Sequence, residues 1–358
     1  MAHQSDLSAR YQNILKATIK HYIATAEPVA SKTLAREYDF NVSSATIRNI
    51  MGRLEEAGLL YQPHVSAGRI PSDSGYRTYV DHLLVNDGKT NTAVQKLLNQ
   101  RLQIARVSFE ALLQQAAKIL ATLSGYIALV TFPQSLHGIL RHLQLVRIAT
   151  NQVMLIVVTD SYQTQSIVMD SPLKEHEVDE SIIDQKLQLL SNFLDHELKG
   201  HSLAEIATFD WTEIDHSVDQ YADFLRVLLT QLKLAFKTNA SSPILIHGVA
   251  EFLRQPEFTQ LQQVQTLLSL LEEQQEQLLP AIFSLPDMAD SLKKVKIKIG
   301  TENHLEPMRA CTLISANYYQ DDIPVGSVGV LGPKRMLYEN AIALVESTAE
   351  YLSHPFRA

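Results

Sequence analysis

The sequence has little cysteine and lacks the apolar stretch of a membrane protein. A single cysteine, Cys311, occurs in 358 residues. It can form neither an internal disulfide nor a cysteine-based zinc site, so we expect a reducing compartment and predict a cytoplasmic protein. The polar N-terminal residues lack the pattern of a secretory signal, and the run QVMLIVVT is far shorter than the ~20 apolar residues of a membrane helix. We therefore expect no contact with a membrane.

The chain also lacks the common motifs of catalysis and nucleotide binding. It contains no G-x-G-x-x-G after a predicted strand, no G-x-x-x-x-G-K-[ST], no G-x-S-x-G and no H-E-x-x-H. His137 and His142 lie five residues apart, and His304 lies between Glu302 and Glu306, but neither spacing is typical of a metal site. We predict no enzyme activity, no catalytic residues, no bound metal and no cofactor.

The chain has an excess of negative charge, and only its N-terminal part has a positive balance. The net charge of the chain is −8. Residues 1–80 contain nine Lys and Arg against seven Asp and Glu, a balance of +2, which leaves 22 against 32, or −10, for the remainder. If the chain meets phosphate groups, this N-terminal part is the region able to do so, although DNA-binding domains are usually more basic.

Three short helical patterns and a hairpin pattern follow one another at the N-terminus. The helices are predicted to begin near Ser8, Ser31 and Ser43, with serine as the capping residue. The segment LLYQPHVSAGRIPS then reads as a strand, a tight turn and a returning strand. This order predicts a winged helix-turn-helix domain over residues 1–85.

The third predicted helix is amphipathic. On a helical wheel one side is apolar apart from a glycine and defines a buried face, made of Ile47, Ile50, Met51, Leu54 and Gly58. The opposite face is polar or small, with Ala and Gly permitting close approach to a groove; its residues are Ala45, Asn49, Gly52 and Glu56, flanked by Thr46, Arg48 and Arg53.

This polar face is a candidate for reading DNA in the major groove. The side chain of Asn49 can bond adenine with both of its polar atoms, and Arg48 or Arg53 can bond guanine or phosphate. Ser43, Ser44 and the free N–H groups of the first turn suit a phosphate oxygen. The alternative is an ordinary solvated face with Arg48 near acidic neighbours.

The predicted turn of the hairpin contains Gly68 and Arg69. A tight turn requires the glycine, and an arginine at the tip of a wing can enter the minor groove or bind phosphate. The alternative is an ordinary hairpin glycine beside a solvated arginine.

The remainder of the chain predicts an α+β protein with an insertion. After a helical stretch over 91–123, four strand-like runs form an antiparallel sheet, helical spacing follows over 174–240, and strands return before a closing helix. Sheet, helical block and sheet again are typical of a domain interrupted by another.

The sequence is similar to a known family. The stretch EPVASKTLAREYDFNVSSATIRNIMGRLEEAGLLYQPHVSAGRIPSDSGYRTYVD resembles the N-terminal region of the heat-inducible transcription repressor HrcA family, and IKIGTEN and PVGSVGVLGPKRMLY resemble its C-terminal signatures. The resemblance covers nearly the whole chain. At position 50 the family more often has an acidic residue where this chain has Ile50.

The resemblance implies a homodimeric repressor of chaperone genes that binds an inverted-repeat operator in double-stranded DNA, loses activity on heating and depends on a GroEL-type chaperonin. It implies a GAF-like domain interrupted by an inserted, mainly helical dimerisation domain, for which the expected ranges are 86–173 and 243–358 for the GAF-like parts and 174–242 for the insertion. Carried over by position, the family's DNA-contacting residues are Ser43, Ser44, Thr46, Arg48, Asn49 and Arg53 on the helix and His64, Ser66, Gly68 and Arg69 on the wing.

Two other functions are compatible with the residues. The GAF-like domain could be the receptor for a small metabolite that controls DNA binding by the dimer. Alternatively, the winged helix could dock onto a protein and have no role with nucleic acid.

Overall fold

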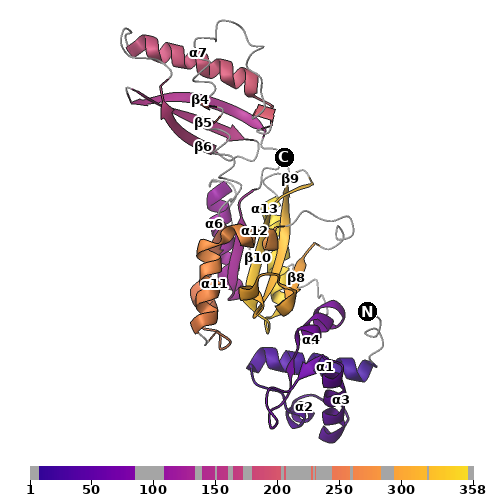
Figure 1. The fold of residues 1–358 in the computed structure, drawn as a ribbon. Coiled ribbons are helices and arrows are strands. Elements are labelled where there is room, and N and C mark those ends of the chain that lie inside the picture. The colour runs from indigo at the N-terminus through magenta and orange to yellow at the C-terminus, as the bar shows by residue number, and fades with distance from the viewer. Residues whose placement is uncertain are drawn as a thin grey trace. The chain divides into compact units, whose positions relative to one another are not determined.

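The structure is a computed structural model that describes residues 8–84, 109–133, 139–149, 151–159, 164–171, 180–202, 205–206, 227–228, 230, 244–258, 261–283, 294–320 and 322–353. Its contacts divide the chain into two compact units. The main unit comprises Met1–Phe132 and Pro243–Ala358, and the inserted unit comprises Pro133–Ser242. Both units mix helices with sheets, which confirms the predicted α+β class (Figure 1).

The main unit begins with three helices and a hairpin, which we call the winged-helix segment. Its elements are α1 (Ala9–Thr25), α2 (Ser31–Glu37), α3 (Ser44–Glu56), β1 (Leu60–Tyr61) and β2 (Ile70–Pro71), in the order that the sequence predicts. Helix α1 ends where Ala26 takes a left-handed conformation, two residues before Pro28. The apolar faces of the helices meet in a core that includes Ile14, Leu34 and Ile47.

A five-stranded antiparallel sheet forms the body of the main unit, in the order β7-β3-β10-β9-β8. The strands are β3 (Ile127–Thr131), β7 (Ile244–His247), β8 (Lys296–Ile299), β9 (Cys311–Gln320) and β10 (Ile323–Pro333). Strand β3 is buried at every position because helices cover both faces of the sheet. One face packs on α6 (Phe109–Ser124) and α13 (Tyr338–Ser353), the other on α10 (Val249–Phe252), α11 (Leu261–Glu273) and α12 (Gln275–Ile282). Residues 91–108 of the predicted long helix lie outside the described residues.

The inserted unit contains a three-stranded antiparallel sheet and a long helix. Strands β4 (Leu140–Ala149), β5 (Gln152–Thr159) and β6 (Thr164–Asp170) pair in sequence order, and the predicted hairpin between the first two is confirmed. One face of this sheet packs on α7 (Glu180–Leu198) through a separate core that includes Leu143, Leu155 and Leu194. Most of the helical block predicted after residue 200, including Trp211, lies outside the described residues.

Strands β4, β5 and β6 do not belong to the domain that was predicted for them. The predicted ranges assigned residues 133–173 to the first part of the GAF-like domain. In the structure they form a sheet of their own and share a core with α7, so they group with 133–242. The physical reason is the pattern of burial along the strands. Strand β3 is buried on both sides, whereas β5 alternates buried with more exposed positions, as a sheet covered on one face does.

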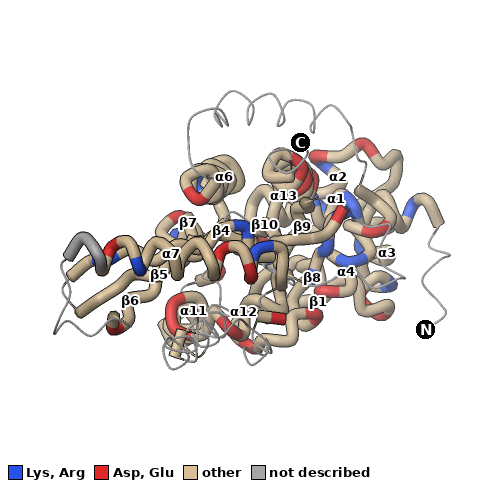
Figure 2. The backbone as a smooth tube through the Cα atoms, turned by 90° about the horizontal axis from the view of Figure 1, so that it is seen from above, with Lys and Arg blue, Asp and Glu red and all other residues tan. Residues whose placement is uncertain are grey.

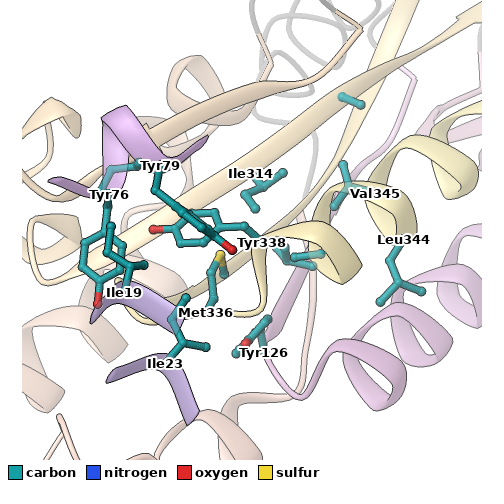
Figure 3. Close-up of a cluster of buried hydrophobic side chains, with 14 of the residues drawn as sticks. Ile19, Ile23, Tyr76, Tyr79, Tyr126, Ile314, Met336, Tyr338, Leu344 and Val345 are labelled. Atoms are coloured by element: carbon teal, nitrogen blue, oxygen red, sulfur yellow. The ribbon is translucent and has the colours of Figure 1, made fainter. Parts of the chain in front are cut away.

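A linking helix connects the winged-helix segment to the body. It consists of α4 (Asp73–Thr78), capped by Ser72, and a π-helical turn, Tyr79–Leu83. Tyr76 and Tyr79 of this helix pack near Tyr338 of the body, and Ile19 and Ile23 of α1 lie in the same cluster (Figure 3). The segment and the body therefore share one hydrophobic core.

No described helix has the length and apolar character needed to cross a lipid bilayer.

Candidate nucleic-acid interface

The N-terminus of α3 is built by a serine cap, as predicted. The hydroxyl of Ser43 accepts a hydrogen bond from the backbone N–H of Thr46 at 3.2 Å, and the two hydroxyl groups lie 3.0 Å apart. Such a cap satisfies one of the free donors of the first turn. Ser43 and Thr46 thus hold the start of the helix in place, while Ser44 begins the helix beside them.

The buried face of α3 is the predicted one except for Gly58, which lies beyond the end of the helix and is exposed. Ile47, Ile50, Met51 and Leu54 are buried. Ile50 is only 5% exposed, so the position at which the resemblance led us to expect an acidic residue faces the core. Ile50 therefore takes no part in the polar face.

Two polar side chains stand exposed on the other side of α3. Arg48 and Asn49 are both exposed, and neither makes a side-chain hydrogen bond or an ion pair within the part of the chain that the structure describes. Because their neighbours Ala45 and Gly52 are small, an edge of a base pair can approach the helix closely. These two side chains are free to bind a partner outside the chain.

Arg53, the second candidate cation of α3, is turned toward α1. Its guanidinium donates a hydrogen bond to the hydroxyl of Tyr11 at 3.0 Å, although the residue remains exposed. This contact orients Arg53 beside the N-terminal part of α1. No pattern in the sequence signalled it, because Tyr11 and Arg53 belong to different helices.

Arg69 does not lie at the tip of the wing, contrary to the prediction from the sequence. Its backbone forms an antiparallel bridge to Val29, with both N to O distances at 2.9 Å. Its guanidinium binds the carboxylate of Glu55 at 2.9 Å, and its side chain is 18% exposed. A methyl group on Gly52 would lie 3.8 Å from this guanidinium. Arg69 therefore links the hairpin to α3.

The tip of the wing consists of residues 64–67. The N–H of Ala67 donates to the carbonyl of His64 at 2.9 Å, which closes a turn. The amide of Gln62 donates to the carbonyls of Val65 and Ala67, at 2.9 and 2.8 Å. His64, Val65 and Ser66 are exposed, and Val65 is fully so. The tip is braced from within and presents its side chains outward.

Gly68 has a different role from the predicted one. A Cβ at this position would lie 2.5 Å from the carbonyl carbon and oxygen of Val29. The hairpin can pass so close to the loop after α1 only because residue 68 has no side chain.

The ten predicted site residues all lie on α3 with its cap or on the hairpin. All ten are exposed or half-exposed. Four of them hold α3 and the hairpin in place, namely Ser43, Thr46, Gly68 and Arg69. The other six are Ser44, Arg48, Asn49, Arg53, His64 and Ser66. Four further residues of this surface were not predicted from the sequence. The contacts of Gln62, Glu55 and Tyr11 depend on how the hairpin and the helices pack together. Val65 could have been noticed, because it is an apolar residue in an otherwise polar turn.

Charge differs between elements of the main unit. Lys and Arg occur along α1, α3 and α4, whereas α11 and α12 contain Glu but no Lys or Arg (Figure 2). Within the described ranges, no group of three His, Cys, Asp or Glu side chains could hold a metal ion.

The fold, with the polar face of α3 and the hairpin beside it, defines the class of protein. It is a winged-helix protein with an α+β body. Comparison with known proteins then gives the family. Residues 110–342 match the family described as HrcA protein C terminal domain. A protein of Cyanothece sp. (strain PCC 7425 / ATCC 29141), named heat-inducible transcription repressor HrcA, is 53% identical over 357 residues, covering 98% of each chain. One of Synechocystis sp. (strain ATCC 27184 / PCC 6803 / Kazusa), with the same name, is 49% identical over 366 residues, covering 97% of each. The chain belongs to the HrcA family, and the resemblance seen in its sequence is confirmed.

The fold also has a solved counterpart. A crystal structure titled as that of a hypothetical protein aligns with a TM-score of 0.64, covering 98% of this chain and 99% of that one. At 21% sequence identity, this likeness concerns the fold alone.

Proposed function

We propose that this chain is a transcription repressor of chaperone genes that binds an inverted-repeat operator in double-stranded DNA as a homodimer. The observation that carries the proposal is the pair of exposed side chains Arg48 and Asn49 on α3, which bond to none of the described residues, in a chain of this family. Asn49 would bond adenine and Arg48 guanine or phosphate in the major groove. Ser44, Arg53, His64 and Ser66 would contact the sugar-phosphate backbone.

The capping and bracing residues have a supporting role in this proposal. Ser43 and Thr46 set the start of α3, Gly68 lets the hairpin pass close to Val29, and Arg69 binds the hairpin to Glu55 of α3. A reading helix held in this way does not lose conformational freedom when it binds, which preserves affinity.

The proposed dimer contacts lie in the inserted unit, which interrupts a body that we propose to be GAF-like. These contacts are expected in residues 174–242, and the sheet of the same unit adds an apolar face. On this face Val146 pairs with Met154 and Met154 with Val168 across the strands. Val146, Ile148 and Val168 are 36%, 45% and 52% exposed. A second copy of the unit would cover such side chains and place two α3 helices on two half-sites.

Heat would relieve repression through marginal stability. A domain stable by only ~5–15 kcal/mol loses its folded form over a modest rise in temperature, and exposed apolar surface then promotes aggregation. We propose that a GroEL-type chaperonin in the cytoplasm restores the DNA-binding form, so that chaperonin occupied by other unfolded proteins leaves the repressor inactive.

A binding comparison tests the proposal. The wild-type chain should bind an inverted-repeat duplex, selected from a randomised pool, more tightly than a scrambled duplex. Asn49→Ala should weaken binding to the inverted repeat by about 1–3 kcal/mol and binding to scrambled DNA much less. Asn340→Ala is the matched control, because Asn340 is an exposed asparagine on helix α13 of the body.

Equal affinity of the wild type for the two duplexes would refute the proposal that this chain is a sequence-specific repressor. Unchanged retention on DNA after Asn49→Ala would favour the protein-docking alternative. Repeating the comparison at two temperatures, with and without chaperonin, tests the proposed heat response.

A further inference from the structure

Asp73, the first residue of α4, is bonded to two separate loops of the body. Its carboxylate accepts hydrogen bonds from the N–H and the hydroxyl of Thr301, at 3.0 and 3.2 Å. Its other oxygen binds the ammonium of Lys334 at 2.7 Å. Both partners are distant in the sequence, Thr301 by 228 positions and Lys334 by 261. A residue next to the wing is thus attached to the C-terminal part of the chain.

Arg77, one turn further along α4, makes a second attachment. Its guanidinium binds both carboxylate oxygens of Glu302, with Nε at 2.9 Å from the first of them, and donates to the carbonyl of Ile297 at 2.7 Å. A two-pronged contact of this kind fixes orientation as well as distance, because the guanidinium and the carboxylate must be coplanar.

The turn that receives these groups is itself rigid. The Nδ2 group of Asn303 lies 3.1 to 3.4 Å from four backbone carbonyls, those of Lys298, Gly300, Met308 and Cys311. Glu302 also accepts the N–H of Ile299 at 2.8 Å. Gly300 has a φ of +55°, and a Cβ there would overlap the carboxylate of Asp73. The turn therefore fits closely around Asp73.

Apolar packing and a third polar contact lie beside these ion pairs. Tyr79 donates a hydrogen bond from its hydroxyl to Glu339 at 3.2 Å and packs edge-on near Tyr338 (Figure 3). Arg335, which follows Lys334, binds Glu257 and donates to the carbonyl of Ile23 in α1 at 3.3 Å.

We propose that Asp73 and Arg77, with Thr301, Glu302 and Lys334, form a joint that fixes the winged-helix segment to the body and so sets the half-site spacing that the dimer accepts. These five residues are positioning residues; none of them touches DNA in the proposed complex. This inference rests on the proposed function, because spacing has meaning only for a dimer on two half-sites.

The geometry of DNA makes spacing a sensitive readout. Inserting one base pair between half-sites moves one of them by about 3.4 Å and turns it by about 35°, since ten to ten and a half base pairs make one helical turn of about 34–36 Å. A segment that is fixed to the body cannot follow this movement without breaking contacts. A segment on a loose hinge can follow it.

The first experiment measures affinity for the selected inverted repeat, for the same duplex with one base pair inserted, and for a single half-site. In the wild type the insertion should weaken binding at least tenfold, roughly the cost of one lost specific base contact. Arg77→Ala and Glu302→Gln should reduce this ratio to about threefold or less, with half-site affinity within about twofold of wild type, since the DNA-contacting residues are unchanged.

Two features keep this test specific. Gln at position 302 still offers an oxygen to the N–H of Ile299, so Glu302→Gln preserves the turn while weakening the contact with Arg77. Lys294→Ala is the control, because Lys294 forms an ion pair at the surface of the body with Glu346, 3.8 Å away, and should leave the ratio unchanged.

A second experiment needs no DNA. Spin labels are placed on Arg36→Cys and Arg309→Cys, both exposed, in labelled chains diluted with unlabelled ones. The distance distribution between the labels should be narrow in the wild type and broader in Arg77→Ala and Glu302→Gln. If the distribution stays as narrow as in the wild type, or if it broadens without any change in the spacing ratio, the proposed role of the joint is wrong. A wild type without any spacing preference would refute the proposed dimer on DNA instead, and the label distances would still decide whether the joint is rigid.

Discussion

Arg48 and Arg77 both belong to the N-terminal part of the chain, but their guanidinium groups have opposite environments. Arg48 is exposed on α3 and makes no ion pair within the described part of the chain. Arg77 is 29% exposed and bound to Glu302, Asp81 and a backbone carbonyl. The hydrogen bond from Arg77 to Glu302 raises the pKa of Arg77 above its usual value despite partial burial. The polar face of α3 keeps its charge available to a partner, whereas the joint uses its charges to hold the fold.

The largest effect is expected where the wing passes Val29. Gly68→Ala would place a Cβ 2.5 Å from backbone atoms of Val29, and backbone cannot move aside cheaply. We expect a loss of about 1–3 kcal/mol in the free energy of unfolding, measured with urea. Gly52→Ala is the control, since its Cβ would lie 3.8 Å from the Arg69 guanidinium, an ordinary contact. Equal stability of the two variants would show that the wing is not held as described.

A gain is expected beside the joint. The hydroxyl of Tyr76 is buried and has no hydrogen-bond partner among the described residues. Tyr76→Phe removes this unsatisfied group and should raise the free energy of unfolding by about 1 kcal/mol. Tyr79→Phe, which loses a hydrogen bond to Glu339, should change it in the opposite direction. Destabilisation by Tyr76→Phe would mean that the hydroxyl has a partner after all.

The joint should also respond to acid. Burial raises the pKa of Asp73, but the hydrogen bonds from Lys334 and Thr301 and the positive charge of Lys334 together lower it by more, so the pKa is below its ordinary value. The ionised carboxylate therefore stabilises the folded chain at any pH above the unfolded pKa of about 3.9, and this contribution is lost as pH falls through the lower folded value.

Unfolding in urea from pH 7 to pH 2 measures this contribution as the difference between the wild type and Asp73→Asn. The difference should stay constant at neutral pH and shrink below about pH 4. A difference that grows as pH falls would have the wrong sign for an ionised Asp73.

The smallest effect on stability is expected on the polar face of α3, and it sharpens the contrast between the two arginines. Arg48→Ala should change the free energy of unfolding by no more than about 0.5 kcal/mol, because the side chain is exposed. It should nevertheless weaken DNA binding and, if Arg48 contacts a phosphate, reduce the slope of log affinity against log salt by about 0.9. Arg309→Ala, an exposed arginine of the body, should change neither quantity. A destabilised Arg48→Ala would show that this arginine supports the fold.

Local patterns predicted much of the reading helix and little of its surroundings. The cap at Ser43 and the buried face around Ile47 follow from spacing along one helix, and both are present in the structure. The partners of Arg53 and Arg69 were not predictable, because Tyr11 and Glu55 come close to them only when α1, α3 and the hairpin pack together. The grouping of β4, β5 and β6 with α7 depended similarly on which faces of the strands are covered.

The sequence by itself determined the family, the α+β composition and the position of the polar helix, because these depend on motifs and on periodicity between near neighbours. Only the tertiary structure decided which charges are free and which are bonded. Asp73 and Arg77 lie near the wing, whereas Lys334 and Glu302, with which they pair, lie in the C-terminal part of the chain, and no local pattern specifies such a contact. The sequence shows where an arginine occurs, and the fold determines which groups its guanidinium contacts.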